Sequence, residues 1–292
     1  MGGAVECWPG RSFLECALTE KSKLPNVATV RTDLFGYDSA AALRFAITRT
    51  QRHNDVLVAV VRYDDGTGAT VDAYVATPRS RVDEPLPGVV LAHGGFEPGK
   101  HLFLDQAVEL SAAGFAVLAA DTTFPRSGNA AAVEAAIRSG VVIHRRSLDV
   151  LQEHYGSSRL GLFGHSKGGS EGAVLSAVEP RLSAIVIGGM GSASPERKEA
   201  AYMYTIASTR QYFEAIYSFD AGLYLSVPGQ RRLLVQHGIS DNAVTLAESR
   251  AMFDAASDPK AWREYDCGHG IDGHQDARSD RIAFFRHWLD LP

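Results

Sequence analysis

The feature that most restricts the fold is the alternation of apolar runs with helix-spaced segments from residue 88 onward. The apolar runs are short and rich in Val, Ile, Leu and Ala, as strands buried on both faces are. This alternation predicts an α/β fold, in which a mostly parallel twisted sheet carries helices on both faces. The expected strands are 88–95, 115–121, 159–166, 182–189, 231–238 and 261–268, and the expected helices are 101–113, 130–155, 168–178, 243–256 and 275–289.

Two further strands precede this alternation. Residues 55–64 and 70–78 are rich in β-branched residues, and the turn sequence DDGTG lies between them. We therefore expect an antiparallel hairpin at an edge of the sheet. Residues 1–54 carry scattered Pro and Gly with little periodicity, so we expect an irregular arm with one short helix at 40–47. The α/β domain is then expected to span 55–292.

One segment interrupts the alternation. Residues 190–230 are longer than a simple crossover between two strands and contain seven Tyr and Phe residues, among them Tyr204 and Phe213. Such an excursion predicts a lid over a pocket, with some of these aromatic rings binding substrate, because ligand sites favour aromatic walls. The alternative is that the rings pack on the sheet as ordinary core.

Composition excludes several classes of function. The net charge of −5 and a pI near 6.1 argue against a nucleic-acid-binding protein, which usually has clustered Lys and Arg. No apolar run approaches the roughly 20 residues that a membrane span needs. The first 20 residues lack the pattern of a signal peptide, and three cysteines fit a reducing compartment, so we expect a cytoplasmic protein. A homo-oligomer is a possible assembly.

The sequence Gly164-His165-Ser166-Lys167-Gly168 fits G-x-S-x-G and lies between an expected strand and an expected helix. That context is the one in which the motif presents a nucleophile, because small residues let the chain turn sharply at the carboxyl end of a strand. We therefore predict that Ser166 is a nucleophile. The alternative is a glycine-rich packing turn.

A serine hydroxyl needs a base, and the base needs a carboxylate. His269 follows the expected strand 261–268, and Asp241 follows 231–238, so both should reach the same edge of the sheet as Ser166. Asp241 could instead cap the following helix. Weaker alternatives are His274 for the base and Asp220 or Asp272 for the carboxylate.

The loop after residues 88–92 reads His93-Gly94-Gly95-Phe96. We predict an oxyanion hole made by the amide of Lys167 and the amide of Gly95 or Phe96. His93 is expected to pin this loop. Arg126 could bind a substrate carboxylate or remain solvated. No metal or organic cofactor is expected.

With these residues in place, the chain resembles the α/β-hydrolases, and within them the dienelactone-hydrolase-like and acyl-CoA-thioesterase-like group. The resemblance covers about 71–291 and rests on HGGF, GHSKGG, GISDN and CGHGI, with the order Ser166, Asp241, His269. Dienelactone hydrolases use cysteine where this chain has Ser166, so the resemblance leaves open whether their particular lactone is a substrate here.

The resemblance implies hydrolysis of a small acyl substrate, an ester, thioester or lactone, through an acyl-enzyme at Ser166. Three alternatives remain open. The same ester could be attacked by an alcohol or amine, giving an acyltransferase or a cyclising enzyme. The triad could instead serve a ligand-sensing receptor, or a peptidase.

Overall fold

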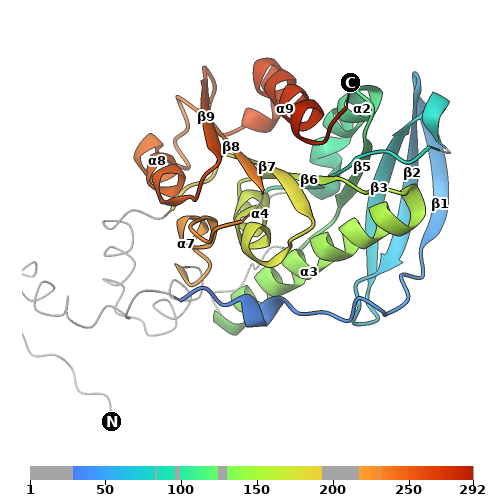
Figure 1. Cartoon of the computed structure of the whole chain (residues 1–292), viewed down its shortest axis with the longest axis horizontal. Coiled ribbons are helices and arrows are strands. Elements are labelled where there is room, and N and C mark those ends of the chain that lie inside the picture. Colours follow the sequence, from blue (N-terminus) through green and yellow to red (C-terminus); the bar gives the residue numbers. More distant parts are fainter. Residues whose placement is uncertain are drawn as a thin grey trace, which may run out of the picture.

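Nine strands form a single mixed sheet in the computed structural model, which describes residues 29–82, 84–95, 99–123, 130–192, 217–229 and 231–291. The order across the sheet is β1-β2-β3-β5-β4-β6-β7-β8-β9 (Figure 1). The strands are β1 Ala46–His53, β2 Val56–Asp64, β3 Thr70–Pro78, β4 Gly88–Ala92, β5 Ala116–Ala120, β6 Leu160–His165, β7 Leu182–Gly188, β8 Arg232–Gly238 and β9 Lys260–Tyr265.

The predicted mostly parallel sheet is confirmed. Strands β4 to β9 pair in parallel, whereas β3 pairs antiparallel with β5 and with β2. The expected hairpin of β2 and β3 is present, with Val56 opposite Pro78 and Asp64 opposite Thr70. Its expected place at the edge is wrong, because β1 pairs with β2 and forms the edge instead.

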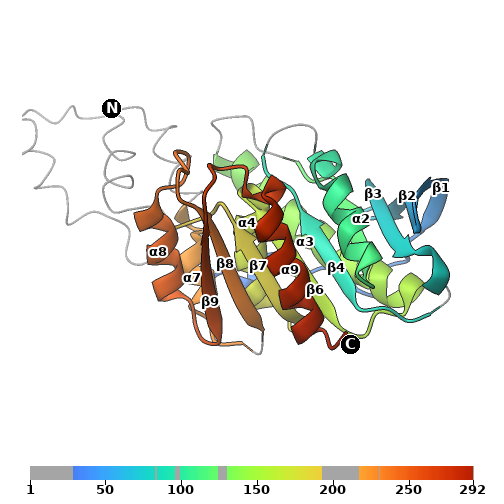
Figure 2. The ribbon, with the colours of Figure 1, turned by 90° about the horizontal axis from the view of Figure 1, so that it is seen from above.

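Helices cover both faces of the sheet, as predicted. Figure 2 shows α2 and α9 on one face, and α3, α4 and α7 lie on the other. The helices are α2 Leu104–Ala112, α3 Ala130–Tyr155, α4 Lys167–Val178, α7 Ala221–Leu225, α8 Leu246–Ala255 and α9 Gln275–Trp288, with 3₁₀ turns η2 Thr32–Phe35, η3 Arg79–Arg81, η4 Gly99–Phe103 and η5 Ile271–Gly273.

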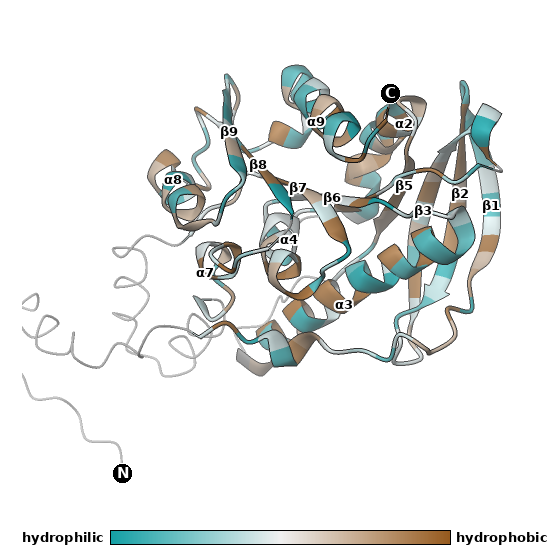
Figure 3. Ribbon diagram, viewed as in Figure 1, coloured by the Kyte–Doolittle hydropathy of each residue, from teal (hydrophilic) through white to brown (hydrophobic). Residues whose placement is uncertain are grey.

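Burial explains why these sequences form these elements. Every residue of β4 and β5 is buried, which fits strands that are covered on both faces. The long helix α3 alternates between hydrophilic and hydrophobic residues along its length (Figure 3), and its buried Val141, Leu148 and Leu151 pack in the core. The helix therefore covers the sheet with one face and meets solvent with the other.

The chain before β2 differs from the prediction. The expected helix at 40–47 is absent, and β1 begins at Ala46 within the arm that we expected to be irregular. The β-branched Ile47, Thr48 and Thr50 favour this strand, and the neighbouring β2 supplies the hydrogen bonds. Phe35 is fully buried, and its ring lies 6.0 Å from that of Phe219.

Candidate active site

Ser166 lies at the sharp turn between β6 and α4, as predicted. Its backbone has φ +53° and ψ −117°, a conformation that an L-residue with a side chain rarely adopts. The backbone N–H of Ser166 donates to the carbonyl of Gly188 at 2.9 Å, and the carbonyl of Ser166 accepts the N–H of Ser170 at 3.1 Å. The strained turn is thus held from both sides, and it carries the hydroxyl at the carboxyl end of β6.

The glycines around Ser166 are required by close packing. A Cβ atom on Gly168 would overlap the carbonyl oxygen of Ala92, at the end of β4, and would lie 2.8 Å from the carbonyl oxygen of His93. A Cβ atom on Gly164 would overlap the carbonyl group of Gly168. The helix can therefore start against the β4 loop only because both positions lack a side chain.

His269 lies beside the serine, in the loop after β9. Its Nε2 is 3.1 Å from Ser166 Oγ, and its Nδ1 is 2.9 Å from Asp241 Oδ2. An ionised carboxylate can only accept, so Nδ1 carries the proton and donates to Asp241. Nε2 then has a lone pair that faces the hydroxyl of Ser166. A general base needs this tautomer, with the proton on Nδ1.

Asp241 contacts the ring of His269, but it does not cap the following helix as the alternative expected, because Thr245 is the N-cap of α8. Its side chain is fully buried. Oδ1 accepts the amides of Ala243 at 2.8 Å and Val244 at 2.9 Å, which fixes the turn after β8, while Oδ2 faces His269. Burial raises the pKa of Asp241, but the amide of Val244, the His269 ring and the amide of Ala243 together outweigh it and hold the pKa below its ordinary value.

His165, the residue before the serine, holds the loop that carries His269. Its Nε2 donates to the backbone carbonyl of His269 at 2.8 Å, and the two rings lie 5.0 Å apart. Burial lowers the pKa of His165, so the ring is favoured in its neutral form. The side chain acts through the backbone of His269 and not on the reacting atoms.

The residues that we predict to form an oxyanion hole belong to two loops, the one after β4 and the one between β6 and α4. Lys167 opens α4 directly after Ser166. Gly94 lies against the same turn, because a Cβ atom on it would be 3.7 Å from Ser166 Cβ. Gly95 is the last described residue of this loop, and Phe96 lies outside the described residues. The amide of Lys167, together with the amide of Gly95 or Phe96, therefore stays a prediction.

His93 pins the β4 loop, in agreement with its expected structural role. The amide of Thr122, after β5, donates to His93 Nε2 at 3.0 Å. Nδ1 must then carry the proton, and it donates to the carbonyl of Gly94 at 2.6 Å. Burial and the nearby Lys167 ammonium lower the pKa of His93, so this neutral tautomer is favoured.

The weaker candidates lie elsewhere or serve other purposes. Asp220 caps α7, since its Oδ1 accepts the amide of Gly222 at 3.1 Å and the hydroxyl of Ser192 at 2.7 Å. His274 precedes α9, and Asp272 faces His165 at 3.7 Å. Three predicted substrate-binding residues and the proposed lid centre lie outside the described residues: Arg126, Tyr204, Phe213 and 193–216.

Sequence reasoning missed the side chains of Thr122 and Lys167, which join two loops of the site. The Lys167 ammonium donates to Thr122 Oγ1 and also pairs with Glu171 Oε1 at 3.2 Å. The four-residue spacing of Lys167 and Glu171 on a predicted helix was a usable signal for the ion pair. No signal in the sequence pointed to Thr122.

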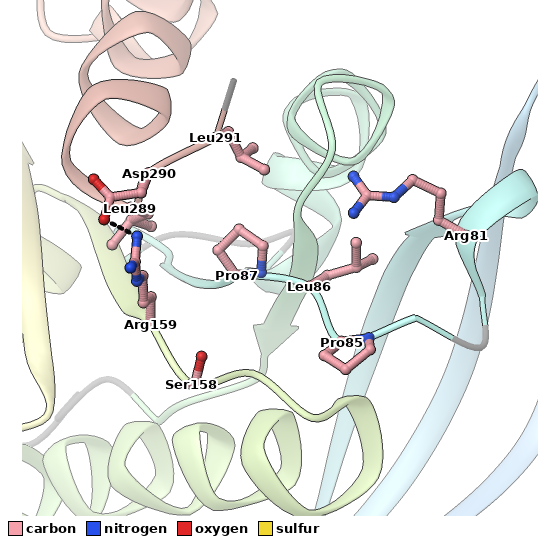
Figure 4. A pocket seen from close by; sticks show the side chains of 9 residues that line it. All are labelled: Arg81, Pro85, Leu86, Pro87, Ser158, Arg159, Leu289, Asp290 and Leu291. Carbon is pink, nitrogen blue, oxygen red and sulfur yellow. Dashed lines mark hydrogen bonds and ion pairs between the residues drawn. The ribbon is translucent and has the colours of Figure 1, made fainter.

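A surface pocket of about 420 Å³ is lined by residues that precede β4 and β6, whereas Ser166 follows the carboxyl end of β6. Figure 4 shows the side chains that line this pocket. The pocket is formed at the amino ends of β4 and β6 and beside the end of α9, and Arg159 pairs with Asp290 across part of it. Because open α/β sheets place ligands at the carboxyl ends of their strands, we assign it no part in the site. Among the described residues no cluster of three or more His, Cys, Asp or Glu side chains could hold a metal ion, and none of the described helices is long and apolar enough to cross a membrane.

The strand order, the turn at Ser166 and the loops after β8 and β9 together define the α/β-hydrolase fold. Solved structures agree. The acetyl xylan esterase from Paenibacillus sp. R4 matches with a TM-score of 0.67 at 16% identity, over 94% of this chain and 93% of that one. Acetyl xylan esterase 1 from Thermoanaerobacterium sp. JW/SL YS485 matches with a TM-score of 0.64 at 14% identity, over 94% and 91%.

A putative dienelactone hydrolase from Klebsiella pneumoniae subsp. pneumoniae MGH 78578 also matches, with a TM-score of 0.55 at 17% identity over 77% of this chain and 95% of that one. No protein-family model and no curated protein sequence matches the chain. At these identities the likeness shows a shared fold, and the chemistry has to be argued from the residues of this chain.

Proposed function

We propose that this protein is a serine hydrolase that cleaves a carboxylic ester, thioester or lactone through an acyl-enzyme at Ser166. The observation that carries the proposal is the continuous chain of hydrogen bonds from Ser166 Oγ through His269 to Asp241, at 3.1 and 2.9 Å. Three residues from separate loops meet with the base in the tautomer that can accept a proton.

In the first half of the reaction, His269 Nε2 takes the proton of Ser166 while Oγ attacks the acyl carbonyl carbon. Asp241 stabilises the imidazolium, and its burial keeps this interaction strong. The amide of Lys167 and the amide of Gly95 or Phe96 are the proposed donors to the oxyanion that forms. His269 then protonates the leaving alcohol, thiol or lactone oxygen, and the acyl-enzyme remains.

In the second half, His269 accepts a proton from water, which attacks the acyl-enzyme. The same two amides hold the second oxyanion. Collapse of this intermediate returns the proton to Ser166 and releases the carboxylic acid. Every step uses side chains and amides of this chain.

The neighbours in structure guide the choice of substrates. Two of them are acetyl xylan esterases and cover almost the whole chain, so acetyl esters of sugars belong in the first panel together with simple alkyl esters. The putative dienelactone hydrolase adds lactones. The acyl-CoA-thioesterase-like motifs add acyl-CoAs.

The test screens p-nitrophenyl esters, acetylated sugars, lactones and acyl-CoAs, and it detects a covalent adduct at Ser166 by mass spectrometry. We expect turnover of at least one class and an adduct on Ser166. Ser166→Ala should abolish both while the protein stays folded. Wild-type turnover in Ser166→Ala would refute the proposal. Added alcohols or amines that divert the acyl group into new esters or amides would favour an acyltransferase instead.

A further inference from the structure

Thr122 lies where three loops of the site meet. Its amide donates to His93 Nε2 at 3.0 Å, and His93 in turn holds the carbonyl of Gly94. Its hydroxyl oxygen accepts a hydrogen bond from the ammonium of Lys167. Thr122, in the loop after β5, thus connects the loop after β4 with the first residue of α4. We call Thr122, His93 and Lys167 the Thr122 junction.

The ammonium group of Lys167 has a partner for each of its hydrogen-bond donors. Its three N–H donors match three partners, which are Thr122 Oγ1, the carbonyl of Thr123 at 3.2 Å and Glu171 Oε1 at 3.2 Å. Only a tenth of the side chain is exposed. An ammonium that has lost most of its hydration is confined to this position by its partners.

The other end of this arrangement is anchored deep in the core. Glu171 is buried, and its Oε2 lies 2.9 Å from Nε2 of the fully buried His144 on α3. Burial raises the pKa of Glu171, but Lys167 and His144 outweigh it and hold the pKa below its ordinary value. The carboxylate of Glu171 is therefore favoured in its charged form, and its ion pair with the ammonium of Lys167 holds that ammonium in place.

The two proposed oxyanion donors sit on the two segments that the junction connects. Lys167 supplies one amide, and its own side chain points back to Thr122. Gly95 supplies the other, one residue after the Gly94 whose carbonyl His93 holds. We propose that Thr122 is a positioning residue that sets the distance between these two donors. This inference rests on the proposed function, because it assigns a role within the same site.

A purely structural role would have a different consequence. If Thr122 only stabilised the fold, its loss would lower the free energy of unfolding and leave the folded enzyme fully active. If it positions the donors, its loss weakens binding of the transition state more than binding of the substrate. Removing the hydroxyl keeps the amide that donates to His93, and it takes away the acceptor of the Lys167 ammonium together with the longer contact of the hydroxyl with His93 Nε2 at 3.3 Å.

The experiment compares Thr122→Val with Thr122→Ser, using the best substrate of the ester panel. Valine keeps the shape and loses the acceptor, whereas serine keeps the acceptor. We expect kcat to fall about 10- to 100-fold in Thr122→Val, less than the roughly 10²–10³-fold cost of deleting one donor, since the donors are displaced rather than removed. KM should change less than about 3-fold. Thr122→Ser should restore kcat to within about 3-fold of wild type.

A boronic acid that forms a tetrahedral adduct with the serine provides the second readout. Its affinity should fall in Thr122→Val by the same factor as kcat/KM, because the adduct resembles the oxyanion intermediate. Thr50→Val, an equal change on the exposed strand β1, should alter neither value. Thr122→Ala removes the same hydroxyl and carries the same expectation if the valine variant does not fold.

The outcomes separate this proposal from the one on which it rests. An active wild type whose kcat persists within about 3-fold in Thr122→Val, or whose affinity for the boronic acid is unchanged by that substitution, overturns the role of Thr122 alone. A loss confined to KM overturns it as well. A wild type that cleaves no ester and forms no boronic acid adduct overturns the proposed function and this inference together.

Discussion

Replacement of Asp241 by Asn separates the two roles of this side chain. Oδ1 holds the turn after β8 through the amides of Ala243 and Val244, and Oδ2 accepts a hydrogen bond from the Nδ1–H of His269. In Asp241→Asn the amide oxygen can keep the two backbone bonds. The NH₂ group then faces His269, and the ring has to accept at Nδ1 and carry its proton on Nε2.

The magnitude follows from this change of tautomer. With a proton on Nε2, His269 cannot accept the proton of Ser166, and such a change costs about 10⁴ in kcat. That factor corresponds to about 5 kcal/mol of activation free energy. The free energy of unfolding should fall by only about 1–2 kcal/mol, because the bonds to Ala243 and Val244 survive and lose only their charge assistance.

The assay pairs ester hydrolysis with chemical denaturation. Asp220→Asn is the matched control, because Asp220 caps α7 through Oδ1 in the same manner as Asp241 holds its turn. We expect the control to keep wild-type kcat and Asp241→Asn to lose about four orders of magnitude. The reasoning fails if both variants retain activity, or if Asp220→Asn is the one that loses it.

The same variant should alter the acid sensitivity of the fold. The pKa of Asp241 is lower in the folded state than its unfolded value of about 3.9, so its charge contributes stability above that value. This contribution is lost as the pH falls through the folded pKa. Residue 241 does not titrate in Asp241→Asn, and the free energy of unfolding of this variant should therefore decline less than that of wild type between pH 5 and pH 2. An equal decline in both proteins would contradict the lowered pKa.

Two further predictions concern the turn at Ser166. Ser166→Gly should be inactive but more stable than Ser166→Ala by about 1 kcal/mol or more, because glycine tolerates the φ of +53° that strains alanine; equal melting temperatures of the two variants would disprove the strain. Gly168→Ala should lower the free energy of unfolding by about 1–3 kcal/mol or more, because its Cβ meets the Ala92 carbonyl and backbone cannot yield as a side chain can. Gly273→Ala, with no atom within 4 Å of the added Cβ, is the control for denaturant titrations, and equal midpoints for the two alanine variants would refute the packing argument.

The sequence by itself determined the parts of the fold that depend on local pattern. Helix α3 runs from Ala130 to Tyr155 as its periodicity predicts, and the parallel strands fall within three residues of their expected limits. The sequence also predicted that Ser166, Asp241 and His269 lie close together. Each of them comes after a strand, and the carboxyl ends of these strands reach the same edge of the sheet.

The tertiary structure decided what depends on neighbours distant in the chain. Strand β1 forms because its backbone pairs with that of β2. Phe35 is buried because its ring packs against the rings of Phe219 and Tyr224. Thr122 meets His93 and Lys167 because β4 lies between β5 and β6 in the sheet, an order that no stretch of sequence contains. Periodicity reports which face of an element is buried, whereas the partners on that face are fixed only when the strands take their order.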